Sequence, residues 1–179
     1  MTPEESSLLI IDVQEKLLPA MDEKEEIFEN ICRLVKGATT LEIPTIATEQ
    51  YPKGLGVTVP ELMQCYRGNI PTFPKTSFNA LEQQEVLDWL RGVERTNVFI
   101  CGMESHICVR QTALDLKRKG FYPIVIADCV ASRKKYDKEI AIRSMELEGV
   151  EITTLESAFY ELLRDSKHPA FKEISKLIK

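Results

Sequence analysis

Five short segments of the chain are apolar almost without interruption, and they limit the possible folds more than any other feature. They are SLLIIDV (7–13), IPTIATE (43–49), TNVFICGM (96–103), YPIVIADCV (122–130) and VEITTLES (150–157). Strands with one face in water alternate apolar and polar residues, whereas parallel strands that are covered on both faces do not. Longer amphipathic stretches separate most of these segments, so strands and helices alternate along the chain.

This order predicts a single domain over residues 1–179, of the α/β class. We expect a three-layer, open and mainly parallel six-stranded sheet with helices on both faces. The sixth strand is NIPTFP (69–74), inside an irregular stretch, 48–78, that is rich in proline and glycine and is expected to form a working loop. Gly120 and Gly149 follow two amphipathic stretches, where glycine commonly ends a helix.

The composition argues against several functional classes. A net charge of -5 provides no basic surface for nucleic acid. No apolar run is long enough to span a bilayer and the first residues, MTPEESS, are acidic, so a soluble, cytoplasmic protein is expected. The five cysteines form no CxxC pair and no zinc-like spacing with histidine, which favours free thiols.

Polar residues at the ends of the apolar segments are the first place to search for chemistry. Ligands of open parallel sheets bind beyond the carboxyl ends of the strands. The polar positions there are Asp12, Glu49, Gln50, Lys75, the segment ESHIC (104–108) and Asp128. We expect all of them to lie along one rim of the sheet.

Three of these residues could carry catalysis, and each has a structural alternative. Asp12 follows four apolar residues and could be a general base, or it could cap a turn by accepting backbone N–H groups. Cys108 is expected near a helix start, three residues after the potential cap Ser105, where the helix dipole would lower its pKa; alternatively it is a buried core thiol. Lys75 could stabilise both anions, or it could be a solvated surface lysine.

Together these residues and their surroundings resemble a known superfamily. The sequences LLIIDVQ (8–14), a lysine after the third strand, GMESHICVRQTALDL (102–116) and VIADCVASR (125–133) are similar to those of the isochorismatase-like cysteine hydrolases. That superfamily also includes nicotinamidases and N-carbamoylsarcosine amidohydrolases. The likeness runs over about residues 6 to 160 and implies a Rossmann-like hydrolase fold.

The resemblance implies a catalytic triad of Asp12, Lys75 and Cys108. Asp12 would take the thiol proton, Lys75 would stabilise the charged pair, and the Cys108 thiolate would attack a carbonyl carbon. The resemblance also implies a cis peptide bond between Met103 and Glu104. The N–H groups of Glu104 and Cys108 would then form the oxyanion hole.

The chain departs from the family pattern at two places. Nicotinamidases carry metal ligands after the second strand, whereas this chain has TEQYPKGLG (48–56), with Glu49 and Tyr51 at the positions of an Asp and the first His. No metal and no other cofactor is therefore expected. The lysine is followed by KTSF instead of the longer KxxxSAF, which affects the expected role of Phe78 as a pocket wall, while Gln50 and Tyr51 are expected to contact substrate.

The sequence leaves three functions open. The first is a metal-independent cysteine hydrolase of a small amide, carbamoyl or related acyl substrate that forms a thioester intermediate. The second is a vinyl-ether hydrolase in which Cys108 is incidental, and the third is a binding or scaffold protein that keeps the fold without turnover. We also expect a homo-oligomer, because the segments 138–150 and 158–179 carry surplus apolar residues, including Phe159, Tyr160, Leu163 and Phe171; the alternative is that the C-terminal helix folds back on its own sheet.

Overall fold

A computed structural model describes all residues, 1–179, and confirms the α/β fold. Six parallel strands form one sheet in the order β3-β2-β1-β4-β5-β6. The strands are β1 (Ser6–Ile11), β2 (Thr45–Gln50), β3 (Thr72–Lys75), β4 (Asn97–Met103), β5 (Tyr122–Ala131) and β6 (Glu151–Thr153). The order reverses direction at β1, so the carboxyl ends of β1 and its neighbours are where a ligand is expected.

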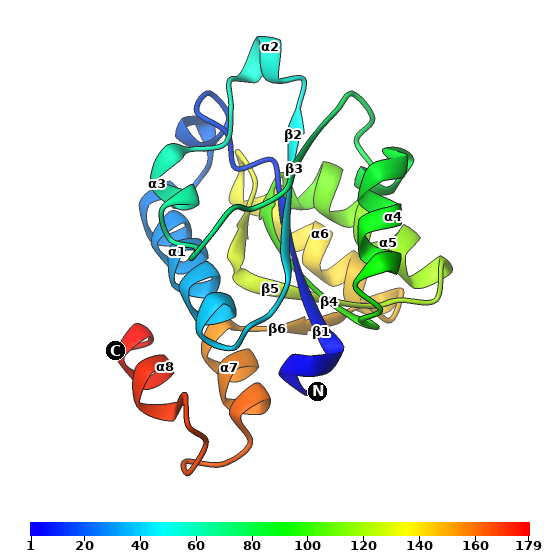
Figure 1. The fold of residues 1–179 in the computed structure, drawn as a ribbon. Helices are drawn as coiled ribbons and strands as arrows, with labels where there is room; N and C mark the ends of the chain where they lie inside the picture. The colour runs from blue at the N-terminus through cyan, green and yellow to red at the C-terminus, as the bar shows by residue number, and fades with distance from the viewer.

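Helices cover both faces of the sheet (Figure 1). They are α1 (Lys24–Thr40), α2 (Pro52–Leu55), α3 (Pro60–Met63), α4 (Gln84–Gly92), α5 (Arg110–Arg118), α6 (Lys135–Leu147), α7 (Leu155–Leu163) and α8 (Phe171–Leu177). One core contains side chains from α1, α7 and α8, and the other contains side chains from α4, α5 and α6. Strand β1 supplies both: Leu8 and Ile10 enter the first core, whereas Leu9 and Ile11 enter the second. Its unbroken apolar sequence follows from burial on two sides.

The C-terminal segment folds back on its own chain and buries part of the apolar surface that its sequence predicts. Phe159 and Leu163 are buried in the core beneath α1, and Tyr160 packs its ring against Phe171. Phe159 lies so close to α1 that a Cβ added at Gly37 would come within 2.1 Å of the ring. Phe159 and Leu163 therefore stabilise the monomer, which agrees with the alternative of a C-terminal helix folded back on its own chain, whereas Tyr160 is 41% exposed and the homo-oligomer stays a prediction.

Strand β5 continues past Asp128, which changes the expected placement of this residue. The strand continues to Ala131, with an irregularity in its pairing to β4 between Ile100 and Gly102. Within this irregular part Asp128 accepts a hydrogen bond of 2.8 Å from the backbone N–H of Leu155, at the start of α7. Asp128 therefore supports a helix start. The expectation that it lies with the other polar residues of the rim is wrong.

No helix in the structure is both long and apolar enough to cross a membrane.

Candidate active site

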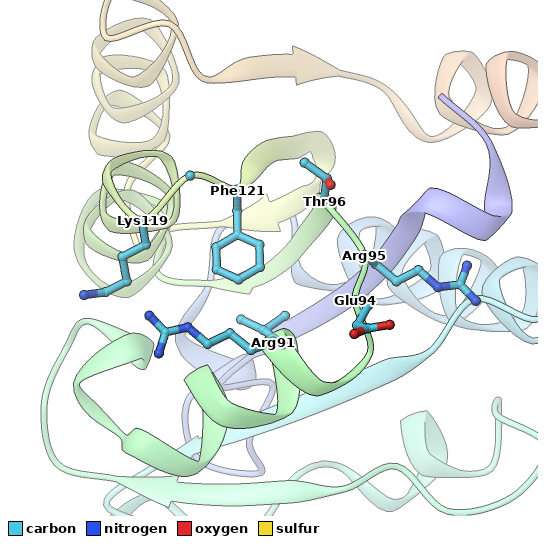
Figure 2. Close-up of a pocket in the computed structure, with 8 residues that line it drawn as sticks. Arg91, Glu94, Arg95, Thr96, Lys119 and Phe121 are labelled. Atoms are coloured by element: carbon cyan, nitrogen blue, oxygen red, sulfur yellow. The ribbon is translucent and has the colours of Figure 1, made fainter.

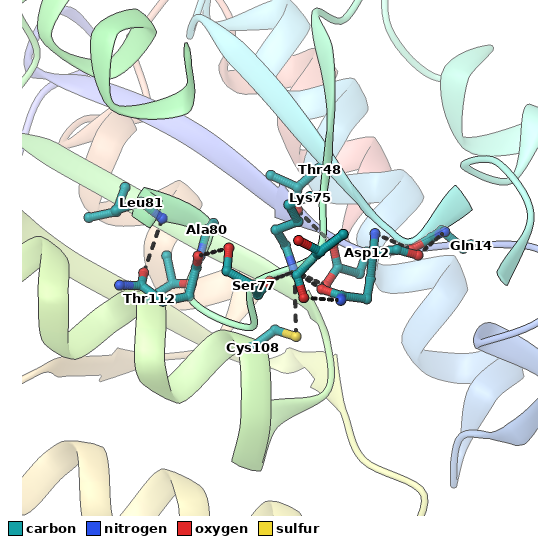
Figure 3. Close-up of polar contacts among 12 residues, drawn as sticks. Asp12, Gln14, Thr48, Lys75, Ser77, Ala80, Leu81, Cys108 and Thr112 are labelled. Atoms are coloured by element: carbon teal, nitrogen blue, oxygen red, sulfur yellow. Dashed lines mark hydrogen bonds and ion pairs between the residues drawn. The ribbon is translucent and has the colours of Figure 1, made fainter. Parts of the chain in front are cut away.

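Asp12, Lys75 and Cys108 lie together at the carboxyl ends of the central strands (Figure 3). Asp12 directly follows β1, Lys75 is the last residue of β3, and Cys108 lies in the turn after β4. The Lys75 Nζ atom is 2.7 Å from Asp12 Oδ2 and 3.6 Å from Cys108 Sγ. Residues that are 63 and 33 positions apart in the sequence are thus brought into one buried cluster.

Lys75 is surrounded by more acceptors than it has protons. Its ammonium group donates to Asp12, to Gln50 Oε1 at 2.6 Å and to the backbone carbonyl of Ser77 at 3.2 Å. A lysine carries three N–H donors, so these oxygens satisfy all of them and the more distant Cys108 sulfur competes for the same protons. Lys75 is only 3% exposed, which excludes the solvated surface lysine considered from the sequence.

Both carboxylate oxygens of Asp12 are bonded to side chains. Lys75 donates to Oδ2, and the Thr48 hydroxyl donates to Oδ1 at 2.8 Å. Asp12 is fully buried and has a left-handed backbone conformation, with φ 54°. The carboxylate therefore does not act as a cap for backbone N–H groups, and it is fixed beside the thiol by two strands.

Cys108 occupies a π-helical turn, η4 (Ser105–Val109), which continues into α5. Burial raises the pKa of its thiol to about 12, and the neighbouring Asp12 carboxylate adds to this increase, while Lys75 opposes it. The expectation that a helix dipole lowers this pKa is wrong, because desolvation and the adjacent anion are the larger effects. With its pKa raised in this way, the resting thiol is protonated at neutral pH.

The backbone before Cys108 has a defined and unusual geometry. The peptide bond between Met103 and Glu104 is cis, and Gly102 just before it has φ 111°. The buried Glu104 carboxylate accepts hydrogen bonds from Arg133, at 3.0 Å from Nε and at 3.2 Å from the backbone N–H. Ser105 does not act as a helix cap: its buried hydroxyl has no hydrogen-bond partner.

The three residues expected to line the substrate pocket, Gln50, Tyr51 and Phe78, do not lie in one pocket. Gln50 contacts Lys75 directly and donates to the Thr76 carbonyl at 2.8 Å, so it belongs to the charged cluster. Tyr51 is exposed and lines a hollow of about 390 Å³ that also contains Lys75. Phe78 is exposed as well, but it lines another hollow, which extends along α5.

The segment after β2 is held to the protein by side chains. Glu49 Oε1 accepts from the backbone N–H and the hydroxyl of Thr58, at 2.6 and 2.9 Å. Gln14 exchanges two hydrogen bonds with the backbone of Gln50 and donates to the Gly56 carbonyl. No group of three or more His, Cys, Asp and Glu side chains lies close enough to hold a metal ion.

A further hollow, of about 300 Å³, lies at the opposite end of the strands (Figure 2). Thr96 and Phe121 in its wall immediately precede β4 and β5, whereas the cluster of Asp12, Lys75 and Cys108 follows the strands. Arg91 and Lys119 contribute positive charge on the side of the Phe121 ring, whereas the Arg95 side chain points away from the ring and donates to the Pro3 carbonyl. Its place at the amino ends of the strands separates it from the site containing Cys108.

Two residues of the site were not singled out from the sequence. Thr48 orients Asp12, and Gln14 anchors the segment that begins at Gln50. Thr48 lies two residues before Gln50 on β2, and this period-two spacing places both side chains on one face of the strand. That spacing could have identified Thr48, whereas the contacts of Gln14 depend on a loop whose path the sequence does not define.

The sequence profile of the family described as "Isochorismatase domain" matches residues 6–157. The chain belongs to this family of hydrolases. It is 39% identical to "Isochorismatase domain-containing protein 1" of Danio rerio, an alignment that covers 100% of this chain and 62% of the relative. The chain thus spans less than two thirds of that relative. It is 40% identical to "Isochorismatase domain-containing protein 2" of Xenopus laevis, with 97% of this chain and 83% of the relative covered.

Solved structures share the fold over nearly the whole chain. The "MAR1 Ribonuclease" of Caenorhabditis elegans has a TM-score of 0.92 at 40% identity. The alignment covers 99% of this chain and 91% of the ribonuclease chain. The YcaC protein of Escherichia coli, described as an octameric hydrolase of unknown specificity, has a TM-score of 0.93 at 22% identity, with 99% and 88% covered. The second comparison supports the fold alone.

Proposed function

We propose that this isochorismatase-family protein is a metal-independent cysteine hydrolase of small amide, carbamoyl or related acyl substrates. One observation carries the proposal: Cys108, Asp12 and Lys75 form a buried cluster in which Lys75 is hydrogen-bonded to both Asp12 and Cys108. A nucleophile, a base in contact with it and a cation that orients the base are the components of covalent acyl transfer.

The raised pKa of Cys108 determines the order of events. The thiol stays protonated until a carbonyl carbon is in reach of sulfur, and the proton then moves to Asp12 as the S–C bond forms. Lys75 stabilises the negative charge, which is shared between the sulfur and the carboxylate. The carbonyl electron pair moves to oxygen, where the N–H groups of Glu104 and Cys108 would form the oxyanion hole.

The second half of the cycle restores the enzyme. The tetrahedral adduct collapses to a thioester, and the leaving amine takes the proton from Asp12. Asp12 then removes a proton from water, which attacks the thioester carbon. The C–S bond breaks, the sulfur takes the proton back from Asp12, and the acid leaves. The hollow beside Lys75, lined by Tyr51, has a size suitable for a small molecule.

The metal-free character of this proposal rests on the donor set. The Glu49 carboxylate is bonded to Thr58, and Tyr51 stands in place of an imidazole. Metal analysis of protein purified without chelator should find no stoichiometric zinc, iron or manganese. One bound equivalent per chain would contradict the proposal.

The name of the Caenorhabditis elegans relative suggests a second function, RNA cleavage. The charge of this chain, -5, is unfavourable for a polyanion. The Asp12–Lys75–Cys108 cluster also contains no histidine, and His106 is bonded to Ser132 by its Nδ1 atom. We therefore favour acyl chemistry and include RNA in the test.

The experiment is a screen of small amides and carbamoyl compounds for release of ammonia, with isochorismate and a single-stranded RNA as further substrates. We expect ammonia release that is lost in Cys108→Ala and retained in Cys65→Ser, the matched thiol control outside the site. Hydrolysis of isochorismate that persists in Cys108→Ala would favour a vinyl-ether hydrolase in which Cys108 is incidental. Cleavage of the RNA would favour the activity for which the Caenorhabditis elegans relative is named. No turnover of any substrate would favour a scaffold.

A further inference from the structure

The four cysteines outside the active site form a cluster of their own. Cys32 lies on α1 beside Cys65, which follows α3, while Cys101 on β4 and Cys129 on β5 continue the cluster inward. Cys101 and Cys129 are fully buried in the core, whereas Cys32 and Cys65 are only partly covered. The outer two thiols are therefore the pair that small solutes can reach.

The surroundings of Cys65 give access from solvent. Cys65 lines a surface hollow of about 210 Å³ between α1 and α8, together with Lys36 and with the ion pair between Arg67 and Glu173. Its sulfur is held in place by a hydrogen bond of 3.3 Å to the carbonyl of Glu61. Lys36 follows Cys32 by one helical turn of α1, so a positive charge lies next to both thiols.

We propose that Cys32 and Cys65 form a redox modification site, at which hydrogen peroxide or a related peroxide converts the neighbouring thiols into an intramolecular disulfide. Two observations support it: Cys32 and Cys65 come from two separate segments that pack against the same core and are near enough for Cys65 to affect the Cys32 thiol, and Cys65 opens into a surface hollow beside Lys36. The proposal does not depend on the chemistry of Cys108.

The reaction has two balanced steps. The Cys65 sulfur attacks peroxide, so that the O–O bond breaks, an S–O bond forms and the first water leaves. The Cys32 sulfur then attacks the sulfenic sulfur; the S–S bond forms, the S–O bond breaks and the departing hydroxyl takes up the Cys32 proton as the second water. Two thiols are oxidised by two electrons, and one peroxide is reduced to two waters.

The environment of Cys32 determines which thiol reacts first. Burial and the neighbouring Cys65 raise the pKa of Cys32 to about 12, so Cys32 keeps its proton at neutral pH. Cys65, at the hollow, is therefore the thiol that meets the oxidant, and Cys32 resolves the product. The Lys36 charge opposes the increase in the Cys32 pKa, and so it favours loss of the Cys32 proton in the second step.

The test uses the full chain, treated with a small excess of hydrogen peroxide, blocked with iodoacetamide and mapped by mass spectrometry without reduction. We expect about tenfold more of the Cys32–Cys65 cross-linked peptide than of any other cysteine pair. The cross-link should persist in Cys108→Ser, should be absent in Cys65→Ser and should be reversed by dithiothreitol.

Three results would overturn the proposal. The two cysteines could be recovered as free, alkylatable thiols, as separately oxidised sulfinic acids, or in cross-links to Cys108 or to another chain. Cys65→Ser is sufficient as the control if Cys32→Ser fails to fold, because Cys65 lies outside regular structure at the surface.

Discussion

Lys75 Nζ lies 2.7 Å from Asp12 Oδ2, and neither side chain is exposed to solvent. Taking two charges out of water is costly, and such a pair is often no more stabilising than a well-packed apolar pair. The pair is therefore better explained by the proposed chemistry than by stability, since it keeps a carboxylate and a cation fixed beside one thiol.

The first prediction separates the two partners by their opposite effects on Cys108. Asp12 raises the pKa of the thiol and Lys75 lowers it. Asp12→Asn should therefore lower this pKa and Lys75→Met should raise it, although both variants should lose turnover. The rate of Cys108 alkylation, followed from about pH 8 to pH 11 by peptide mapping, measures the shift.

Lys53→Met is the control, because Lys53 is exposed in the hollow next to Lys75. A pH profile that is identical in Lys75→Met and in the unmodified protein would remove Lys75 from the site. The raised pKa also predicts that Cys108 does not react preferentially with iodoacetamide at about pH 6, in contrast to the low-pKa thiol expected from the sequence.

The second prediction concerns Thr48 as a positioning residue. Thr48→Val removes the hydrogen bond to Asp12 Oδ1 with little change in volume. We expect kcat to fall about tenfold with KM nearly unchanged, since the base is misoriented and the substrate hollow is intact. Thr45→Val, on the same strand but bonded to the Ile43 carbonyl, is the matched control. An equal loss in both variants would indicate a general effect on β2.

The third prediction concerns Gly102, next to the Met103–Glu104 peptide. A Cβ at this position would come within 2.0 Å of the Ile11 carbonyl oxygen, and Gly102 has φ 111°. Gly102→Ala should lower the free energy of unfolding by about 3 kcal/mol or more, because backbone atoms of β1 must move. Chemical denaturation measures the loss.

Gly68→Ala distinguishes the clash from the backbone conformation. Gly68 has a similar φ, 109°, but no atom within 4 Å of an added Cβ. Its substitution should cost only about 1–2 kcal/mol. Similar losses at both glycines would show that conformation, and not the approach to Ile11, dominates.

The fourth prediction is a homo-oligomer that forms through α6. Tyr136, Ile140 and Leu147 lie on one side of this helix and are 70%, 48% and 80% exposed. Light scattering at micromolar concentration should give at least a dimer, and Ile140→Glu with Leu147→Glu should give a monomer. Glu146→Lys, on the same helix, is the control. A monomer mass for the unmodified protein would reject the prediction.

The sequence predicted the elements that carry strong apolar patterns and missed those defined by contacts. The unbroken apolar segments located the strands, because burial on both faces selects such residues. Helix α4 (Gln84–Gly92) was not predicted, since QEVLDWLRG buries only Val86, Leu87 and Leu90 among charged neighbours. The path of residues 51–71 also depends on individual side chains such as Glu49 and Gln14.

Within the candidate site, the positions of Asp12, Lys75 and Cys108 followed from the rule that polar residues end buried strands. The protonation of Cys108 did not follow, because pKa depends on burial and on charges contributed by other strands. The sequence left open whether Phe159 and Leu163 pack on their own chain or on another, because a one-dimensional pattern does not show which apolar face meets which partner.

Strand β3 has only four residues and pairs only with β2, at the edge of the sheet, yet its last residue supplies the cation of the site. Edge segments are among the first parts of a protein to open, whereas β1 and β4, which position Asp12 and Cys108, lie inside the sheet. The site thus joins parts with unequal resistance to local unfolding. Mild denaturant should release Lys75 while the sheet is still intact, so that loss of activity precedes loss of secondary structure.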